Sequence, residues 1–330
     1  MQRGHVPGQN HTRRKQVRHY VYAPADQRLR RRAITIVFSV VLVFSAWQLI
    51  DYGIDYLGAH QASNKLRELY YSETEEPAAE PTPTPDPTPT PAPTATSDPA
   101  GGPTPEPTPV TELQALRYPG NLYNRVSSRF QKLQRQNKDI IGWLTIPSLL
   151  DEAVVQKDNS YYLRRDYRGY HNVNGSLFLD ENIELNTRPY TLTIYGHNMK
   201  TGAMFGCLRN YENLHFYQQN PFLTFDTMYE DGKYVIFSIT ELSLNAKDYN
   251  YFSFGKVNSD SISRRAEAID VLKSHSLYSS SIEVLPEDQL LLLVTCVDND
   301  EERRIVAARR IRDDETEEEL QRKVNQSRKW

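Results

Sequence analysis

Short runs of apolar and aromatic residues, separated by polar turns, occupy the region from about residue 113 to 311. They are rich in Val, Ile, Leu and Tyr, which fit the pleated and half-buried surface of a β-sheet. Many short strands in one region are typical of a closed or nearly closed sheet. We therefore predict a domain of mainly β character, with strands at residues 140–146, 152–156, 175–180, 190–196, 233–240, 289–296 and 303–311.

Helical spacing of apolar residues interrupts this pattern in two places. Residues 111–138 open the globular region with a helix-like stretch, and residues 261–278 are amphipathic at helical spacing. The second helix falls in the long connection before the run that ends at Cys296. Residues 313–330 are highly charged, with acidic residues before basic ones, and are expected to form a short solvated helix or a frayed tail.

A separate apolar run lies near the N-terminus. Residues 33–50, AITIVFSVVLVFSAWQLI, carry no formal charge. At about 1.5 Å rise per residue such a helix spans roughly 27 Å, close to the thickness of a bilayer's hydrocarbon core. Residues 1–32 hold nine Arg or Lys against a single acidic residue, and positively charged segments resist translocation. We therefore expect one transmembrane helix, a cytoplasmic N-terminus and an extracellular chain after Asp51.

Two other interpretations of residues 33–50 are less favoured. A cleaved secretory signal has a shorter apolar stretch and a small-residue cleavage site, whereas Trp47, Gln48 and Tyr52 lie at the end of this run. A buried core helix would not need the preceding basic segment. The expected location is thus the cell membrane, crossed once.

The composition changes after the apolar run. Residues 51–74 have apolar residues at mixed helical spacing and are expected to form a juxtamembrane helix. Residues 75–110 then hold thirteen of the chain's twenty prolines, many of them alternating with Thr. Such a segment cannot bury a core and favours an extended polyproline II conformation. It is interpreted either as a semi-rigid stalk that lifts a catalytic head, residues 111–312, from the membrane, or as a disordered spacer without a length requirement.

Charge and cysteine content narrow the chemistry. A formal net charge of −3 gives no indication of a nucleic-acid partner. Two cysteines, Cys207 and Cys296, are too few for a disulfide framework, and the sequence has no CxxC or Cys/His cluster at zinc spacing. We therefore expect no metal and no cofactor. One bridge between the two cysteines is permitted outside the cell, so that a disulfide competes with a reactive thiol.

Three candidate catalytic groups lie at the ends of predicted strands. Cys296 follows the apolar run LLLLVT and is either a nucleophile at the rim of the sheet or a small packing residue. His197 follows another strand, in YGHNM, and an imidazole beside a thiol can stabilise the thiolate or return a proton to a leaving amine. Arg303 and Arg304 begin the strand after Cys296, where a guanidinium either binds the oxyanion of an attacked amide or forms a solvated edge.

The order of these blocks resembles the catalytic domain of class B sortases. The blocks are GWLTI, VVQKDNSYYLRRD, GSLFLD, YGHNM, GAMFGCL, LLLVTC and RRIVAARRI, and the resemblance extends over about residues 137–311. The helix-containing connection and the N-terminal anchor also resemble class B. The resemblance implies an eight-stranded sortase-type β-barrel with accessory helices, preceded by one transmembrane helix and a Pro/Thr-rich linker. Within it, residues 161–163 and 177–180 are expected to be mainly structural.

The resemblance also implies a cysteine transpeptidase. Cys296 would cleave a sorting motif of the NPxTx kind after Thr, near the C-terminus of a secreted protein, and form a thioester. His197 would protonate the departing amine and then deprotonate the incoming amine of a peptidoglycan cross-bridge or a pilin lysine. Arg304 would bind the acyl oxygen, with Arg303 as the second choice.

Neighbouring residues are given smaller roles. Asn198 and Tyr195, which flank the histidine, and Thr295, beside the nucleophile, are expected to line the substrate site. Cys207, in GAMFGCLRNY, is interpreted as a packing residue. Two functions compete with transpeptidation: a membrane-tethered cysteine protease that resolves the acyl-enzyme with water, and a non-catalytic stalked surface-binding protein that keeps the barrel as an interaction scaffold.

Overall fold

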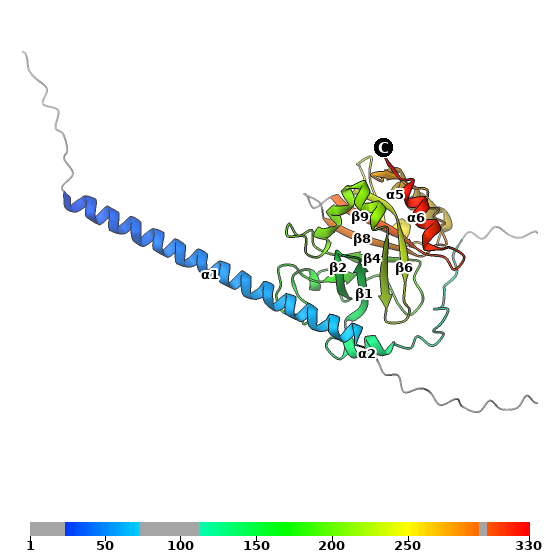
Figure 1. Cartoon of the computed structure of the whole chain (residues 1–330), viewed down its shortest axis with the longest axis horizontal. Coiled ribbons are helices and arrows are strands. Elements are labelled where there is room, and N and C mark those ends of the chain that lie inside the picture. Colours follow the sequence, from blue (N-terminus) through cyan, green and yellow to red (C-terminus); the bar gives the residue numbers. More distant parts are fainter. Residues whose placement is uncertain (1–23, 73–111, 297–301) are drawn as a thin grey trace, which may run out of the picture. The chain divides into compact units, whose positions relative to one another are not determined.

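The computed structural model describes residues 24–72, 112–296 and 302–330. Within these residues eight strands form a closed barrel in the order β1-β2-β3-β4-β8-β9-β6-β5 (Figure 1). The strands are β1 (Ile140–Ile146), β2 (Leu150–Val155), β3 (Leu177–Leu179), β4 (Thr191–Tyr195), β5 (Phe222–Thr227), β6 (Lys233–Ser243), β8 (Leu290–Cys296) and β9 (Glu302–Arg310). The expected eight-stranded barrel is confirmed. Most neighbouring strands are antiparallel, but β2 and β3, and likewise β4 and β8, run in parallel.

Short helices and one small sheet lie outside the barrel. They are α2 (Ser128–Gln134), α3 (Leu214–Gln219), α4 (Phe254–Val257), α5 (Ile262–Ser274), α6 (Glu317–Asn325), the 3-10 helices η1 (Tyr161–Arg164) and η2 (Phe205–Glu212), and the strand pair β7 (Tyr278–Ser279) and β10 (Arg328–Lys329). The first helix expected in the globular region is shorter than the sequence pattern indicates, because only α2 is helical there. The second is α5, in the connection between β6 and β8.

The charged C-terminal residues belong to the fold. Helix α6 buries Leu320 and Val324, which are spaced four residues apart and so lie on one face. Thr316 caps the helix by accepting a hydrogen bond from the backbone N–H of Glu319. The segment is thus helical, but it is packed against the protein rather than solvated or frayed.

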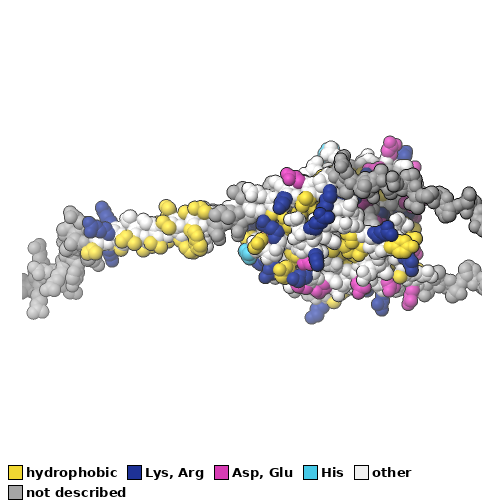
Figure 2. All heavy atoms as spheres, turned by 90° about the horizontal axis from the view of Figure 1, so that it is seen from below, with side chains coloured by type: hydrophobic (Ala, Val, Ile, Leu, Met, Phe, Trp, Pro, Cys, Tyr) yellow, Lys and Arg dark blue, Asp and Glu magenta, His cyan; other side chains and the backbone are white. Residues whose placement is uncertain are grey.

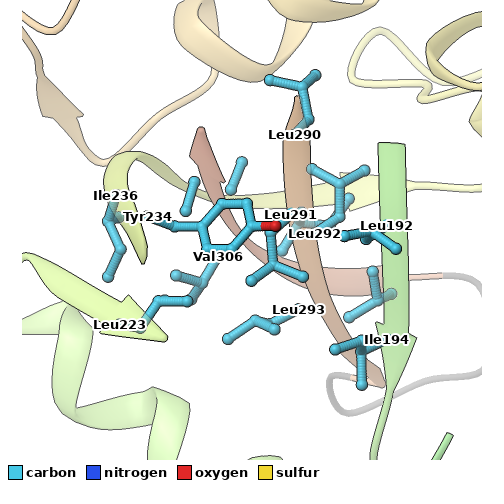
Figure 3. Packing of buried hydrophobic residues seen from close by; sticks show 14 of the residues in the cluster. Leu192, Ile194, Leu223, Tyr234, Ile236, Leu290, Leu291, Leu292, Leu293 and Val306 are labelled. Carbon is cyan, nitrogen blue, oxygen red and sulfur yellow. The ribbon is translucent and has the colours of Figure 1, made fainter. Parts of the chain in front are cut away.

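Four consecutive leucines make β8 a central strand. Leu290 to Leu293 are all fully buried, although adjacent side chains in a strand point to opposite faces. Both faces of β8 must therefore be covered, as in strands that show a continuous apolar run rather than alternation. Figure 3 shows these side chains packed near Leu192, Ile194 and Val306. The strand that ends at Cys296 is thereby held firmly in the core.

The longest helix, α1 (Pro24–Tyr71), is divided between two compact units, Met1–Tyr56 and Leu57–Trp330. In the first unit the apolar side chains are exposed, for example Phe38 at 70% and Leu42 at 69%, and Figure 2 shows them in yellow beside basic side chains in dark blue. Among the described residues, no helix combines the length and the apolar character that a membrane span requires.

The end of α1 packs against the barrel within the second unit. Tyr70 is 4% exposed, and its ring stacks on that of Trp143 with 4.4 Å between the centroids. The Tyr70 hydroxyl donates a hydrogen bond to Asp226. Arg67 forms a salt bridge with Asp151 at 2.8 Å. The last turns of α1 are therefore an integral part of the unit that contains the barrel.

The expected Pro/Thr-rich stalk, residues 75–110, lies outside the described residues. Before it, the Ser72 hydroxyl accepts a hydrogen bond from Lys132 Nζ at 3.1 Å. After it, the backbone N–H of Leu113 donates to the carbonyl of Asp260 at 2.7 Å. The chain on both sides of this segment is thus attached to the same unit.

Candidate active site

Strands β4 and β8 end at the same edge of the barrel. They are parallel, with Tyr195 in register with Val294, and the backbone N–H of Gly196 donates to the Val294 carbonyl at 3.2 Å. His197 and Cys296 each come two residues after this last pair. The parallel register therefore brings the backbones of two segments that are about a hundred residues apart to one edge.

Gly196 allows the chain to leave β4 at this point. A Cβ atom on Gly196 would lie 2.6 Å from the side chain of Leu177 and 2.8 Å from that of Phe205. Such distances are shorter than carbon atoms tolerate, so only glycine lets the backbone pass this closely. The Gly-His sequence thus places His197 directly at the edge.

Strand β9 brings two arginines back to the same edge. It is antiparallel to β8, with Arg303 opposite Cys296 and Arg304 opposite Thr295. Residues directly opposite each other share a face of the sheet, whereas adjacent residues in one strand face opposite sides. Arg303 therefore takes the register position of Cys296, and Arg304 faces the other side.

A cavity of about 300 Å³ opens at this edge, and its wall is mostly apolar. An apolar cavity with a few convergent polar groups is the usual form of a binding site. The lining residues are Asn159, Leu163, Ser176, Phe178, Tyr195, Gly196, His197, Leu244, Phe254, Val294, Thr295 and Arg303.

One hydrogen bond orients the imidazole of His197. Its Nε2 lies 2.6 Å from the carbonyl oxygen of Leu163 in η1. A carbonyl oxygen can only accept, so Nε2 must carry the hydrogen. In the neutral ring the other nitrogen, Nδ1, then lacks a hydrogen. Nδ1 is therefore the atom of His197 that can take up and release a proton.

The guanidinium groups of Arg303 and Arg304 have different surroundings. Arg303 lines the cavity, and its Nη1 donates to the carbonyl of Glu302 at 3.0 Å. Arg304 is 6% exposed, and its Nη2 lies 2.6 Å from Glu212 and 2.5 Å from Glu241. Two carboxylates thus neutralise Arg304 on the far side of the strand. Arg304, chosen from the sequence, and Arg303, its second choice, thus both start at this edge, and the assignment of the catalytic cation to one of them stays a prediction.

Two of the three expected substrate contacts line the cavity. Tyr195 and Thr295 do so, whereas Asn198 is absent from the lining and forms a backbone bridge with Met204. The hydroxyl of Tyr195 donates to the carboxylate of Asp180 at 2.9 Å. Burial, and secondly the charge of Asp180, raise the pKa of Tyr195, so its hydroxyl stays protonated at neutral pH.

Several lining side chains carry no functional signal in the sequence. Leu163 and Phe178 belong to the segments whose expected role is structural, Asn159 lies two residues before the first of these segments, and Leu244 and Phe254 come from the connection that follows β6. A polar residue in the block KDNSYY is the one sequence feature that could have drawn attention to Asn159. The remaining residues are ordinary apolar positions, which only the tertiary structure assembles into a wall.

Cys207 lies elsewhere and has a packing environment. It is 5% exposed in η2, and its Sγ lies 3.0 Å from the carbonyl oxygen of Met204. Burial raises the pKa of the Cys207 thiol to about 12. The thiol therefore stays uncharged at neutral pH, which agrees with the packing role expected from its sequence context.

Comparisons with known proteins agree on one family, although no family model matches the chain. Sortase B of Listeria monocytogenes is 30% identical over 178 residues, which are 53% of this chain and 70% of that protein. Sortase B of Staphylococcus aureus is 31% identical over 173 residues, 52% of this chain and 68% of that protein. The solved complex of S. aureus sortase B with a substrate has 27% identity and a TM-score of 0.51, and it covers 57% of this chain and 87% of that one.

Proposed function

We propose a specific reaction for this chain, which belongs to the sortase family, class B-like, and is therefore a sortase-type cysteine transpeptidase. Cys296 cleaves an NPxTx-like sorting motif after Thr and transfers the acyl group to an amine of the cell wall or of a pilin. The observation that supports this assignment most strongly is the shared edge of β4, β8 and β9, where the backbone of β8 ends at Cys296 and where His197 and Arg303 line an apolar cavity.

In the first step the thiolate of Cys296 attacks the carbonyl carbon of the motif's Thr. The C–S bond forms, the peptide C–N bond breaks, and the imidazolium of His197 gives its proton to the departing amine. Because Nε2 is engaged with the carbonyl of Leu163, the proton given up is the one on Nδ1. The guanidinium of Arg303 stabilises the negative charge on the carbonyl oxygen, and it does so more effectively because the cavity is mostly apolar.

In the second step an amine replaces the first product. The amine attacks the thioester carbon and gives a proton to Nδ1 of His197. The C–N bond of the new amide forms, the C–S bond breaks, and Cys296 returns to the thiolate. Water would yield a carboxylic acid by the same route. The apolar lining disfavours water near the thioester, which supports transfer to an amine over hydrolysis.

The proposed partners are secreted proteins with a C-terminal sorting signal, and an acceptor amine on a peptidoglycan cross-bridge or a pilin. A solved structure of S. aureus sortase B is a complex with a substrate, which supports a substrate with a sorting signal for this chain. No nucleic acid enters this reaction.

The experiment uses a labelled NPxTx peptide and triglycine as the amine. We expect a ligated product whose yield rises with the triglycine concentration. Hydrolysed peptide alone, at every triglycine concentration, would support the tethered protease instead. A chain that neither cleaves nor ligates any sorting peptide would support the non-catalytic scaffold.

We also propose that residues 33–50 anchor the chain in the cell membrane, with the N-terminus in the cytoplasm and the catalytic unit outside. The uncharged run and the nine basic residues before it support this topology. The apolar side chains that α1 exposes in the same stretch are also what a lipid-facing helix would present.

Two arginines in the middle of this run are expected to release the chain from membranes. Val41→Arg with Leu42→Arg would add about 6 kcal/mol to the cost of insertion. The fraction that remains in the pellet after carbonate extraction measures the effect. The control is Leu122→Arg with Tyr123→Arg, an adjacent pair that is 61% and 82% exposed in the catalytic unit. Equal pelleting of both double variants would contradict the proposed anchor.

A further inference from the structure

A buried carboxylate lies behind the wall of the cavity. Asp180 directly follows β3 and is 6% exposed. Its Oδ1 accepts two hydrogen bonds from Asn182, one from the backbone N–H and one from Nδ2, both at 2.9 Å. Its Oδ2 accepts from the hydroxyl of Tyr195 at 2.9 Å and from Nδ2 of Asn159 at 3.4 Å. One oxygen thus fixes the local turn, and the other is directed to two residues of the cavity wall.

These two partners belong to the segments that hold His197. Tyr195 ends β4 two residues before the histidine. Asn159 lies immediately before the turn into η1, in which the carbonyl of Leu163 accepts the hydrogen bond from Nε2. Asp180 therefore links the strand that carries the imidazole to the segment that orients it.

The hydrogen bonds also determine what the wall offers to a ligand. A carboxylate only accepts, so the hydroxyl hydrogen of Tyr195 points to Asp180 and its oxygen lone pairs are left for the cavity. In Asn159 the Oδ1 accepts from the backbone N–H of Glu181 at 2.9 Å, which fixes the amide orientation. One Nδ2 hydrogen goes to Asp180 and the second remains available. The two partners of Asp180 thus add one acceptor, Tyr195, and one donor, Asn159, to the cavity wall.

We propose that Asp180 is a positioning residue of the transpeptidase. It holds His197 in place through two segments, and it sets Tyr195 as an acceptor and Asn159 as a donor toward the bound sorting peptide. A peptide group, with its own N–H and C=O, is the complementary chemistry. The inference rests on the proposed function. It adds to that function a reason why Tyr195 accepts and Asn159 donates hydrogen bonds in the cavity.

Asp180→Asn keeps the shape of the side chain but adds N–H donors. The Tyr195 hydroxyl then loses its charged acceptor, and the donor and acceptor pattern of the wall changes. We expect kcat/KM for ligation of the NPxTx peptide to triglycine to fall roughly 10- to 100-fold, with KM for the peptide carrying part of the loss. The matched control is Asp166→Asn, an equally buried aspartate that pairs with Arg168 outside the cavity and should stay within about 2-fold of wild type.

A double-mutant cycle with Tyr195→Phe separates positioning from general damage. Because Asp180 acts partly through the Tyr195 hydroxyl, Asp180→Asn should reduce kcat/KM clearly less in the Tyr195→Phe background than in the wild type. The proposal would be overturned if the two substitutions lowered kcat/KM independently, so that the double variant lost the product of the two single losses. Wild-type kinetics of Asp180→Asn would overturn it as well. So would an equal loss in Asp166→Asn.

Tyr195→Phe alone keeps the proposal testable if Asp180→Asn does not fold. We expect it to lower kcat/KM by roughly 10-fold at an unchanged unfolding midpoint, and an unchanged kcat/KM would overturn the inference. Failure of the proposed function would look different, because the wild-type chain itself would then give no ligated product.

Discussion

Replacing Cys296 with Ala is expected to abolish transpeptidation, with a loss of at least about 10⁴-fold in kcat/KM. Without sulfur no thioester can form, so covalent catalysis loses its nucleophile. The measurement is the rate of ligation of the NPxTx peptide to triglycine. Intact mass spectrometry of the wild-type protein with peptide alone should in addition show an acyl adduct on Cys296.

Cys207→Ala is the matched control for this variant. Its thiol is buried and has a pKa raised to about 12, so it stays protonated and unreactive between pH 7 and 9. We expect ligation within about 3-fold of wild type, since only packing changes. A thiol reagent should label Cys296 and leave Cys207 untouched in the folded protein. Ligation that survives Cys296→Ala, or labelling of Cys207 alone, would remove the assigned nucleophile.

Arg303→Gln is expected to lower kcat/KM by about 10²- to 10³-fold, the effect of removing an oxyanion-stabilising donor. Arg304→Gln should leave kcat/KM within about 5-fold, because Arg304 faces away from the cavity and pairs with Glu212 and Glu241. The Arg304 variant should instead lose stability, since two carboxylates that are only half exposed lose their cation. Ligation kinetics and urea denaturation of both variants separate the two roles.

Arg303→Lys tests the geometry of the cation as well as its charge. Lysine keeps the charge but lacks the planar fork of donors, so we expect partial recovery over Arg303→Gln. The reverse outcome, in which Arg304→Gln loses ligation and Arg303→Gln does not, would return the catalytic role to Arg304.

The main features of the fold follow from local patterns in the sequence. The LLLLVTC run predicts a buried strand with cysteine at its end, and β8 is that strand with both faces covered. The YGHNM block predicts a strand exit at His197, and Gly196 is indeed a position where no larger residue fits. Such features are predictable because burial and close approach of the backbone restrict residue type at single positions.

The choice between the two arginines could not be made in the same way. Arg303 and Arg304 are adjacent in a strand, so a shift of one residue in the register of β8 with β9 exchanges their faces. The residues that join the two strands do not reveal that register by their number alone. The acidic partners of Arg304 come from η2 and β6, more than sixty residues earlier in the chain.

The packing of the end of α1 against the barrel could not be predicted from the sequence either. The helical spacing of residues 51–74 predicts a helix, but the stack of Tyr70 on Trp143 joins positions on either side of the Pro/Thr-rich segment. The position of Asp180 between Asn159 and Tyr195 likewise depends on three separate segments.

The sequence by itself determined the family, the β character of the catalytic unit, and the cysteine and histidine at its two strand ends. Each of these depends on the order of residues within a short block, which apolar periodicity and residue type make visible. Only the tertiary structure decided which arginine faces the cavity, which side chains form its wall, and that Asp180 supports it. Those relations join residues far apart in the chain, and they depend on strand register and burial, which emerge only when the barrel closes.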